Sequence, residues 1–284
     1  MNRILEFFTT ALLVIPTQAA TIPFTIEEQA PVTSELFLGH GRILIEASYD
    51  NVNLKCLLDT GARQSIINQR FLPHHSIAGT VEGGGIIGIS VIYDLVNIAK
   101  VAINDFVAVN KVVRLSKSLQ DDCIAGNELF YNESMHFDFT TMELRTDILP
   151  TASTENLKTY NDTWYGFPVK IEKQIFDSFW DTGAGLTLLD PKIIEAHPEN
   201  FLKISDTVIN DPTGTSVPAA IYRMKSLRLG NMEVKNATVI AYSTEVLRRT
   251  VADLYMVLGY NIIRQYNWHM DVKNKKWQVI NRPN

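Results

Sequence analysis

A four-residue sequence, Asp-Thr-Gly-Ala, occurs twice in the chain and constrains its fold more than any other feature. Each copy follows an apolar run and leads into another. Burying a lone carboxylate costs free energy unless the group is paired or hydrogen-bonded. The repeat therefore predicts that the two aspartates are each other's partners. The two copies are Asp59, Thr60, Gly61, Ala62 and Asp181, Thr182, Gly183, Ala184.

The repeat extends beyond these four residues. Downstream of each copy, two apolar residues precede a glycine, Gly126 in the first half and Gly259 in the second. Farther on, each half carries a histidine and, two residues later, an aspartate. A repeat at this scale predicts two structurally related halves.

These motifs resemble the active-site signature of aspartic proteases of the retropepsin-like kind. In that family a second strand ends in two apolar residues and a glycine, and a short helix follows, as at Gly126 and Gly259. The resemblance covers both signature loops and both glycine segments, whereas the flanking strands match only in pattern. It implies an all-β fold of two β-barrel-like lobes related by a pseudo-twofold axis, with a few short helices.

The resemblance and the linker composition together predict the domain organisation. Residues 31–148 and 167–284 form the two lobes. Residues 149–166 form a linker, because they contain proline, serine and asparagine and show little apolar pattern.

The N-terminus has the pattern of a secretory signal peptide over residues 1–19. Arg3 supplies the positive start, an apolar stretch follows, and small residues provide a cleavage site. We therefore expect export to the periplasm or the medium. An ordinary N-terminal helix or a membrane anchor is the alternative.

Composition excludes several other classes of protein. The net charge of −5 comes without a basic cluster, which argues against a nucleic-acid partner. No apolar run reaches the ~20 residues that a membrane-spanning helix requires. At 46% apolar residues the chain can build a sizeable core.

The resemblance implies that Asp59 and Asp181 are the catalytic residues and activate one water for peptide-bond hydrolysis. Two carboxylates in contact cannot both ionise easily, so one holds a proton while the other acts as base. Thr60 and Thr182 resemble the threonines that cross-bond the two loops in the family.

Four small residues complete the predicted loops. Gly61 and Gly183 permit tight turns that aim backbone N–H groups at the carboxylates. Ala62 and Ala184 stand where pepsin-type enzymes usually carry a hydroxyl. Losing that hydrogen bond favours the protonated carboxyl, so we expect activity closer to neutral pH.

Arg63, directly after the first copy, has two interpretations. It is a surface arginine, which is the favoured one, or it binds a carboxylate of the substrate.

A glycine-rich segment follows the first copy. Gly83, Gly85 and Gly88 match a dinucleotide-binding fingerprint, but a β-branched run follows where that fingerprint needs a helix. With Gly84 they instead predict the tip of a hairpin that closes over the substrate. Gly214 marks its counterpart in the second lobe, which we expect to be stiffer.

The chain has two cysteines, Cys56 and Cys123. In the resembled fold their strands lie side by side, so export could oxidise them. Neighbouring strands often hold side chains at poor angles for a disulfide. Free buried thiols are therefore the favoured interpretation and a disulfide the alternative.

No cofactor or metal is predicted. His74 and His75 are adjacent, which is not metal-ligand spacing. His136 and His269, repeated with their neighbouring aspartates, are interpreted as structural hydrogen-bonding groups.

The predicted protein is a monomeric endopeptidase whose partner is a peptide or protein substrate. A non-catalytic peptide-binding protein with the same fold is the alternative, and a structural envelope protein ranks last.

Overall fold

The structure is a computed structural model and is mostly β, as the sequence predicts. Residues 1–18 of the predicted signal peptide, Gly88 and Gly214 lie outside the described residues. Among the helices of the described part of the chain, none is long and apolar enough to cross a membrane. The described residues are 19–28, 41–85, 90–131, 133–146, 155–160, 163–210, 216–248, 251 and 253–282.

The N-terminal half forms an eight-stranded sheet with the order β2-β3-β4-β9-β5-β8-β7-β6 and an additional β3–β7 pairing. The predicted turn at Asp50 and Asn51 joins β3 to β4, and both residues have positive φ, a conformation that asparagine and aspartate tolerate. The strands are β2 (Thr25–Glu28), β3 (Gly41–Tyr49), β4 (Val52–Asp59), β5 (Ile66–Asn68), β6 (Ile77–Gly84), β7 (Ser90–Ile103), β8 (Phe106–Ser116) and β9 (Cys123–Gly126).

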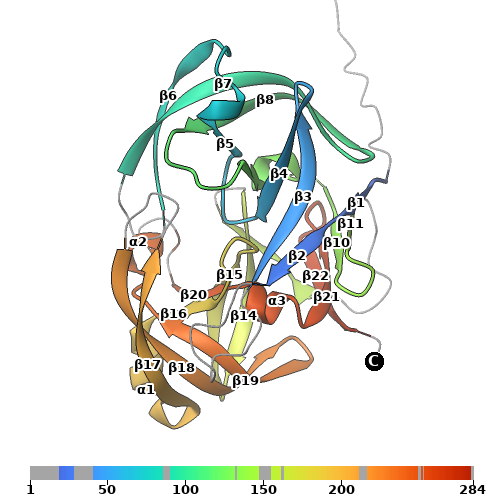
Figure 1. Cartoon of the computed structure of the whole chain (residues 1–284). Coiled ribbons are helices and arrows are strands. Elements are labelled where there is room, and N and C mark those ends of the chain that lie inside the picture. The colour runs from blue at the N-terminus through green and yellow to red at the C-terminus, as the bar shows by residue number, and fades with distance from the viewer. Residues whose placement is uncertain are drawn as a thin grey trace, which may run out of the picture.

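The C-terminal half forms a second eight-stranded sheet with the order β13-β14-β15-β20-β16-β19-β18-β17 and an additional β14–β18 pairing. Figure 1 shows this sheet below the N-terminal one. The strands are β13 (Lys158–Tyr160), β14 (Trp164–Ile171), β15 (Gln174–Trp180), β16 (Thr187–Leu189), β17 (Phe201–Asn210), β18 (Ser216–Leu229), β19 (Met232–Ala241) and β20 (Leu254–Leu258).

The two large sheets repeat one another strand by strand. β4 pairs in parallel with β9, and β15 pairs in parallel with β20. β5 pairs in parallel with β8, and β16 pairs in parallel with β19. The repeat in sequence is thus a repeat in topology, and each position in one half has a counterpart in the other.

A six-stranded sheet, β1-β11-β10-β21-β22-β12, joins the two halves. At its centre β10 from the first half pairs with β21 from the second, and His136 lies opposite His269. Its strands are β1 (Thr21–Pro23), β10 (Met135–Asp138), β11 (Glu143–Thr146), β12 (Glu155–Asn156), β21 (Tyr266–Asp271) and β22 (Lys276–Asn281).

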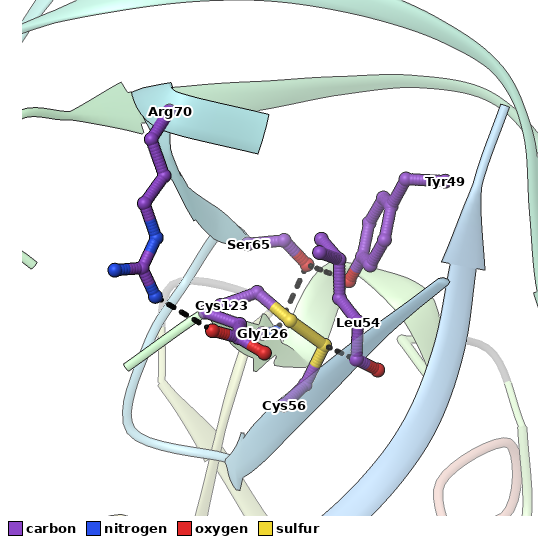
Figure 2. The surroundings of a disulfide bond; sticks show 8 residues. Tyr49, Leu54, Cys56, Ser65, Arg70, Cys123 and Gly126 are labelled. Carbon is purple, nitrogen blue, oxygen red and sulfur yellow. Dashed lines mark hydrogen bonds and ion pairs between the residues drawn. A yellow bond between two sulfur atoms is a disulfide. The ribbon is translucent and has the colours of Figure 1, made fainter. Parts of the chain in front are cut away.

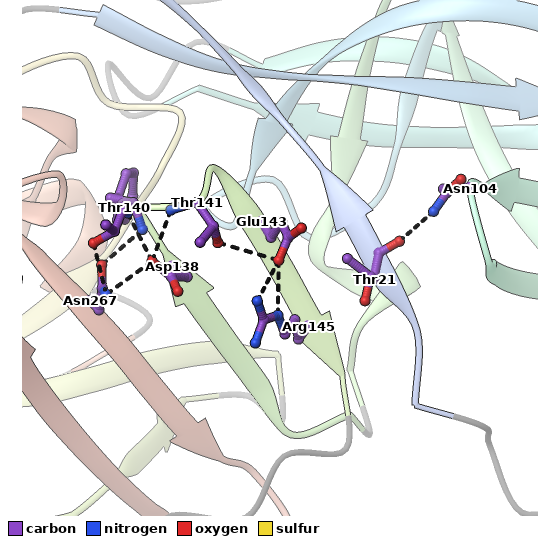
Figure 3. Close-up of polar contacts among 9 residues, drawn as sticks. Thr21, Asn104, Asp138, Thr140, Thr141, Glu143, Arg145 and Asn267 are labelled. Atoms are coloured by element: carbon purple, nitrogen blue, oxygen red, sulfur yellow. Dashed lines mark hydrogen bonds and ion pairs between the residues drawn. The ribbon is translucent and has the colours of Figure 1, made fainter.

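Polar contacts fix the turn that follows β10 (Figure 3). The Asp138 carboxylate accepts hydrogen bonds from the N–H groups of Thr140 and Thr141, at 2.8 and 3.1 Å, and from Asn267 Nδ2 at 3.0 Å. Asn267 lies on β21, so this contact also ties the two halves together. Asp138 therefore organises a turn and its partner strand.

One hydrophobic core spans both halves. Its largest members are aromatic, and Trp180 is fully buried directly before Asp181. The Trp180 ring packs edge-on against Phe137 of the first half, with centroids 4.9 Å apart, and against Phe167, at 6.4 Å. The strand that carries Asp181 is therefore anchored in a packed core.

The helices are short. Asp190 caps the first, accepting a hydrogen bond from the Lys192 N–H at 3.0 Å, as its sequence predicts. Ile193 and Ile194 form the buried face of this helix, whereas Ala196 is exposed. The helices are α1 (Pro191–Ala196), α2 (Glu245–Arg248) and α3 (Tyr260–Ile263), and the 3-10 helices are η1 (Gln69–Phe71), η2 (Asn127–Leu129) and η3 (Pro198–Asn200).

The favoured prediction of two free thiols is wrong, because Cys56 and Cys123 form a disulfide (Figure 2). The two cysteines are direct partners in the parallel β4–β9 pair, and their Cα atoms are 4.6 Å apart. This separation lies within the range that a disulfide bridges.

Candidate active site

The site is built by two loops, one from each half, that follow equivalent strands. Asp59 is the last residue of β4, and Asp181 directly follows β15. Each carboxylate accepts a hydrogen bond from its own loop. The Ala62 N–H donates to Asp59 Oδ1 at 2.9 Å, and the Gly183 N–H donates to Asp181 Oδ1 at 2.8 Å. Both carboxylates keep partial exposure to solvent.

The two loops are held together by buried threonines. The Thr60 N–H donates to Thr182 Oγ1 at 3.0 Å, and the Thr182 N–H donates to Thr60 Oγ1 at 3.1 Å. Each hydroxyl in turn donates to a carbonyl of the other half, Thr60 to Trp180 at 3.1 Å and Thr182 to Leu58 at 2.7 Å. The network fixes the distance between the loops and therefore the approach of the two aspartates.

The glycines of the two loops leave room for this approach. A Cβ atom at Gly61 would lie 2.5 Å from Asp181 Oδ2, and one at Gly183 would lie 2.3 Å from Asp59 Cγ. Both contacts are far below a van der Waals distance. Each glycine is therefore required by the carboxylate of the opposite loop.

Each carboxyl group lies against the glycine of the opposite loop, and each influences the pKa of the other. Burial raises the pKa of Asp59 above its ordinary value, against hydrogen bonds from Ala62, Asp181 and Gly61 that lower it. Burial raises the pKa of Asp181 well above its ordinary value, and the negative charge of Asp59 raises it further. Both shifts favour the protonated carboxyl group, and the repulsion between two carboxylates opposes ionisation of both at once.

A second pair of hydroxyl groups connects each aspartate loop to the downstream glycine of the same half. The Gly126 N–H donates to Ser65 Oγ at 3.0 Å, and the Gly259 N–H donates to Thr187 Oγ1 at 3.1 Å. The sequence analysis did not identify Ser65 or Thr187. The sequence does contain a signal for them, because a residue with a hydroxyl group follows each aspartate at the same distance along the chain.

The segment after each glycine is hydrogen-bonded to the aspartate loop of the same half. The Asn127 N–H donates to the Ala62 carbonyl at 2.8 Å, and the Tyr260 N–H donates to the Ala184 carbonyl at 2.7 Å. Ala62 and Ala184 thus position the loops through their backbone groups.

One tryptophan adds a contact that the sequence analysis also missed. Trp164 Nε1, on β14, donates to the Gly61 carbonyl at 3.0 Å, and the ring packs edge-on against Phe179 with centroids 5.5 Å apart. The Asp59 loop is therefore held by the second half as well as by its own.

The predicted glycine-rich hairpin is formed by β6 and β7. Gly84 pairs with Ser90, and Gly83 with Val91. The segment after Gly85 leads into strand β7, where a dinucleotide site would need a helix.

Among the described residues, one group has the composition and spacing of metal ligands. Glu172, His197 and Glu199 offer ligand atoms within 4.8 Å of one another, at the surface of the second half. Neither aspartate of the site belongs to this group.

A comparison with protein-family models finds no match for this chain. A comparison with curated proteins finds no relative either.

Proposed function

We propose that the chain is an aspartic endopeptidase in which Asp59 and Asp181 activate one water to hydrolyse a peptide bond. The observation that carries this proposal is the coupled pair of carboxyl groups, held at the meeting of two loops by reciprocal threonine hydrogen bonds. The shared strand order of the two halves is the arrangement expected for two related lobes of that family.

The reaction follows from one proton shared by two carboxyl groups. The ionised carboxylate takes a proton from water as the water oxygen bonds to the carbonyl carbon, while the protonated carboxyl donates to the carbonyl oxygen. The tetrahedral intermediate then collapses. The C–N bond breaks as one carboxyl group gives a proton to the leaving nitrogen and the other takes a proton from a hydroxyl of the intermediate, which leaves the carboxylic acid product and restores the singly protonated dyad.

Water activation requires a base that stays ionised beside an acid that stays protonated. The raised pKa of Asp181 and its coupling to Asp59 meet this requirement without a metal ion in either role. Gly61 and Gly183 carry no Cβ atom, which lets each carboxyl group lie directly against the opposite loop.

We further propose that one chain forms the complete site and is active as a monomer, because each half supplies one aspartate. We also propose export of the protein, which the Cys56–Cys123 disulfide supports, since disulfides persist in oxidising compartments.

The test is hydrolysis of a peptide library by the mature protein and by Asp59→Asn and Asp181→Asn. Each substitution should abolish cleavage while circular dichroism and thermal unfolding show a folded protein. Asp105→Asn, in the exposed turn between β7 and β8, removes the same charge and should leave cleavage unchanged. Near-full turnover in either dyad variant would contradict the mechanism. A wild-type protein that binds peptides but cleaves none would instead be the non-catalytic alternative.

A further inference from the structure

We propose that Arg114 forms a subsite that selects an acidic side chain of the peptide substrate, in the first half only. This inference rests on the proposed function and adds a substrate class to it. Five residues make up what we term the arginine cluster, and they come from the Asp59 loop and from β6, β7 and β8. They are Arg63, Gln64, Gly83, Tyr93 and Arg114.

Arg114 is tied to the catalytic loop. Its N–H donates to the Ser65 carbonyl at 2.9 Å, and its Nε donates to Gln64 Oε1 at 3.0 Å. Its guanidinium lies over the Tyr93 ring, 5.4 Å from the centroid. These contacts hold the guanidinium between the Asp59 loop and the β6–β7 hairpin.

The hairpin leaves room for this guanidinium through Gly83. A Cβ atom there would lie 2.5 Å from Arg114 Nη1. A side chain at this position would collide with the guanidinium and displace it. The absence of a side chain at Gly83 therefore leaves room for the guanidinium where it lies. The hairpin predicted to cover the substrate is therefore in direct contact with Arg114.

The charge of Arg114 is not matched by a carboxylate contact. Among the described residues Arg114 makes no ion pair, and its direct polar partner Gln64 is neutral. Tyr93 and, less strongly, Glu128 favour the charged form of Arg114, and burial raises the pKa of Glu128, which favours the neutral form of that carboxyl group. Five arginines of the described residues do pair with a carboxylate, namely Arg42, Arg70, Arg145, Arg248 and Arg264.

A second positive charge lies beside it. Arg63 is exposed, and its charge lowers the pKa of Arg114 after the larger effect of burial. Two arginines near each other without a shared carboxylate repel one another. A bound carboxylate would relieve that repulsion and accept a bidentate hydrogen bond from the guanidinium.

The equivalent position in the second half is apolar, and strand register identifies it. Arg114 lies opposite Ile66 on β5, and Ile240 lies opposite Leu188 on β16. Ile66 and Leu188 stand at the same offset after their aspartates. Ile240 therefore replaces Arg114, and it is buried.

Three other residues of the arginine cluster also have apolar counterparts in the second half. Leu186 stands in place of Gln64, Ala219 in place of Tyr93, and Ile209 in place of Gly83, by the same register. All three pack against the apolar cluster that contains Ile240. The two halves thus share the sequence of their aspartate loops but differ in the side chains beside those loops. This difference is expected of a site that recognises the two ends of a substrate differently.

The experiment uses peptides that the wild-type protein cleaves, with Glu, Gln and Lys placed in turn at each position. At one position, kcat/KM should be roughly tenfold higher for Glu than for Gln, and lower still for Lys. This comparison needs no variant. Equal rates for the three peptides at every position would overturn the proposal.

Arg114→Gln should bring the Glu/Gln ratio of kcat/KM close to one, whereas Arg114→Lys keeps the positive charge and should keep part of the ratio. Arg70→Gln is the matched control, because Arg70 pairs with Asp122 outside the cluster, and it should keep the wild-type ratio. A folded Arg114→Gln protein with an unchanged ratio would also overturn the proposal.

The same peptides are then bound to Asp59→Asn, which separates this proposal from the proposed function. If the wild-type protein cleaves nothing but binding still favours Glu over Gln through Arg114, the proteolytic function fails and the subsite stands. If peptides are cleaved without any preference for Glu, the subsite fails and the function stands.

Discussion

Thr60 and Thr182 each donate a backbone N–H to the other's hydroxyl, at 3.0 and 3.1 Å, and so join the two halves directly beneath the paired aspartates. Both side chains are fully buried, and neither hydrogen bond can be replaced by one to water. The geometry of the dyad therefore depends on a contact between residues distant in sequence.

The first prediction concerns this contact. Thr60→Val keeps the side-chain shape but removes the hydroxyl, which leaves the Thr182 N–H and the Trp180 carbonyl without partners. We expect a loss of about 2–4 kcal/mol in the free energy of unfolding, because buried unpaired groups cost about 1–3 kcal/mol each. Urea unfolding of the variant and the wild-type protein measures this loss of unfolding free energy.

Thr60→Ser retains the hydroxyl and is the matched control, with a loss expected below about 1 kcal/mol. A valine variant as stable as the serine variant would show that the hydroxyl contributes nothing to stability.

The second prediction concerns stability and the dyad. The pKa values of Asp59 and Asp181 are raised in the folded protein, so the folded state holds the proton more tightly than the unfolded state. Their contribution to stability is fully present below pH ~4 and is lost as pH rises through the folded-state values. Asp181→Asn cannot lose a proton and should therefore show a smaller fall in stability from pH 4 to pH 8. Unfolding curves of both proteins across this range measure the difference, and parallel pH profiles would contradict it.

The third prediction concerns the histidines at the centre of the six-stranded sheet. Their ring centroids are 6.0 Å apart, and burial together with the charge of His136 lowers the pKa of His269 to about 4. Since the unfolded chain takes up that proton near pH 6.5, stability should fall between pH 6.5 and pH 4, by on the order of 2 kcal/mol. Titrating His269 by NMR checks the pKa directly.

His269→Gln removes the titrating group and should flatten that acidic part of the stability profile. An NMR midpoint near 6.5 for His269 would refute the prediction. The fall here runs opposite to that of the dyad, so the two effects are distinguishable by their pH direction.

The fourth prediction concerns the disulfide. It closes a loop between residues 67 positions apart, and a loop of that length is expected to stabilise the protein by about 4 kcal/mol at most, through the unfolded chain. Replacing Cys56 and Cys123 together by alanine should lower the unfolding free energy by about 2–4 kcal/mol. The wild-type protein with a reductant is the companion measurement, and a loss below about 1 kcal/mol in both would refute the prediction.

The second half has no disulfide at the equivalent place. Ser178 and Met256 are direct partners at the equivalent place in the β15–β20 pair. The Ser178 hydroxyl donates instead to the Phe167 carbonyl at 2.8 Å. Of the two strands that lead to the aspartates, only β4 is therefore fixed covalently to its neighbour.

The sequence by itself determined the features that are local or repeated. The two Asp-Thr-Gly-Ala copies identified the aspartates, the threonines and the glycines that meet in the structure, because a turn motif is encoded by consecutive residues. The all-β class was expected from the resemblance that these copies carry, and the structure is mostly β.

Only the tertiary structure decided the contacts that depend on register between distant strands. Cys56 meets Cys123 because β4 and β9 pair with those residues directly opposite, and a slip of one residue would point one sulfur to the other face of the sheet. Arg114 reaches the Asp59 loop for the same reason, through the pairing of β8 with β5 and β7. Sequence patterns specify which residues face inward. The pairing of distant strands specifies which of those residues come into contact, and the contacts beside the two aspartates depend on that pairing.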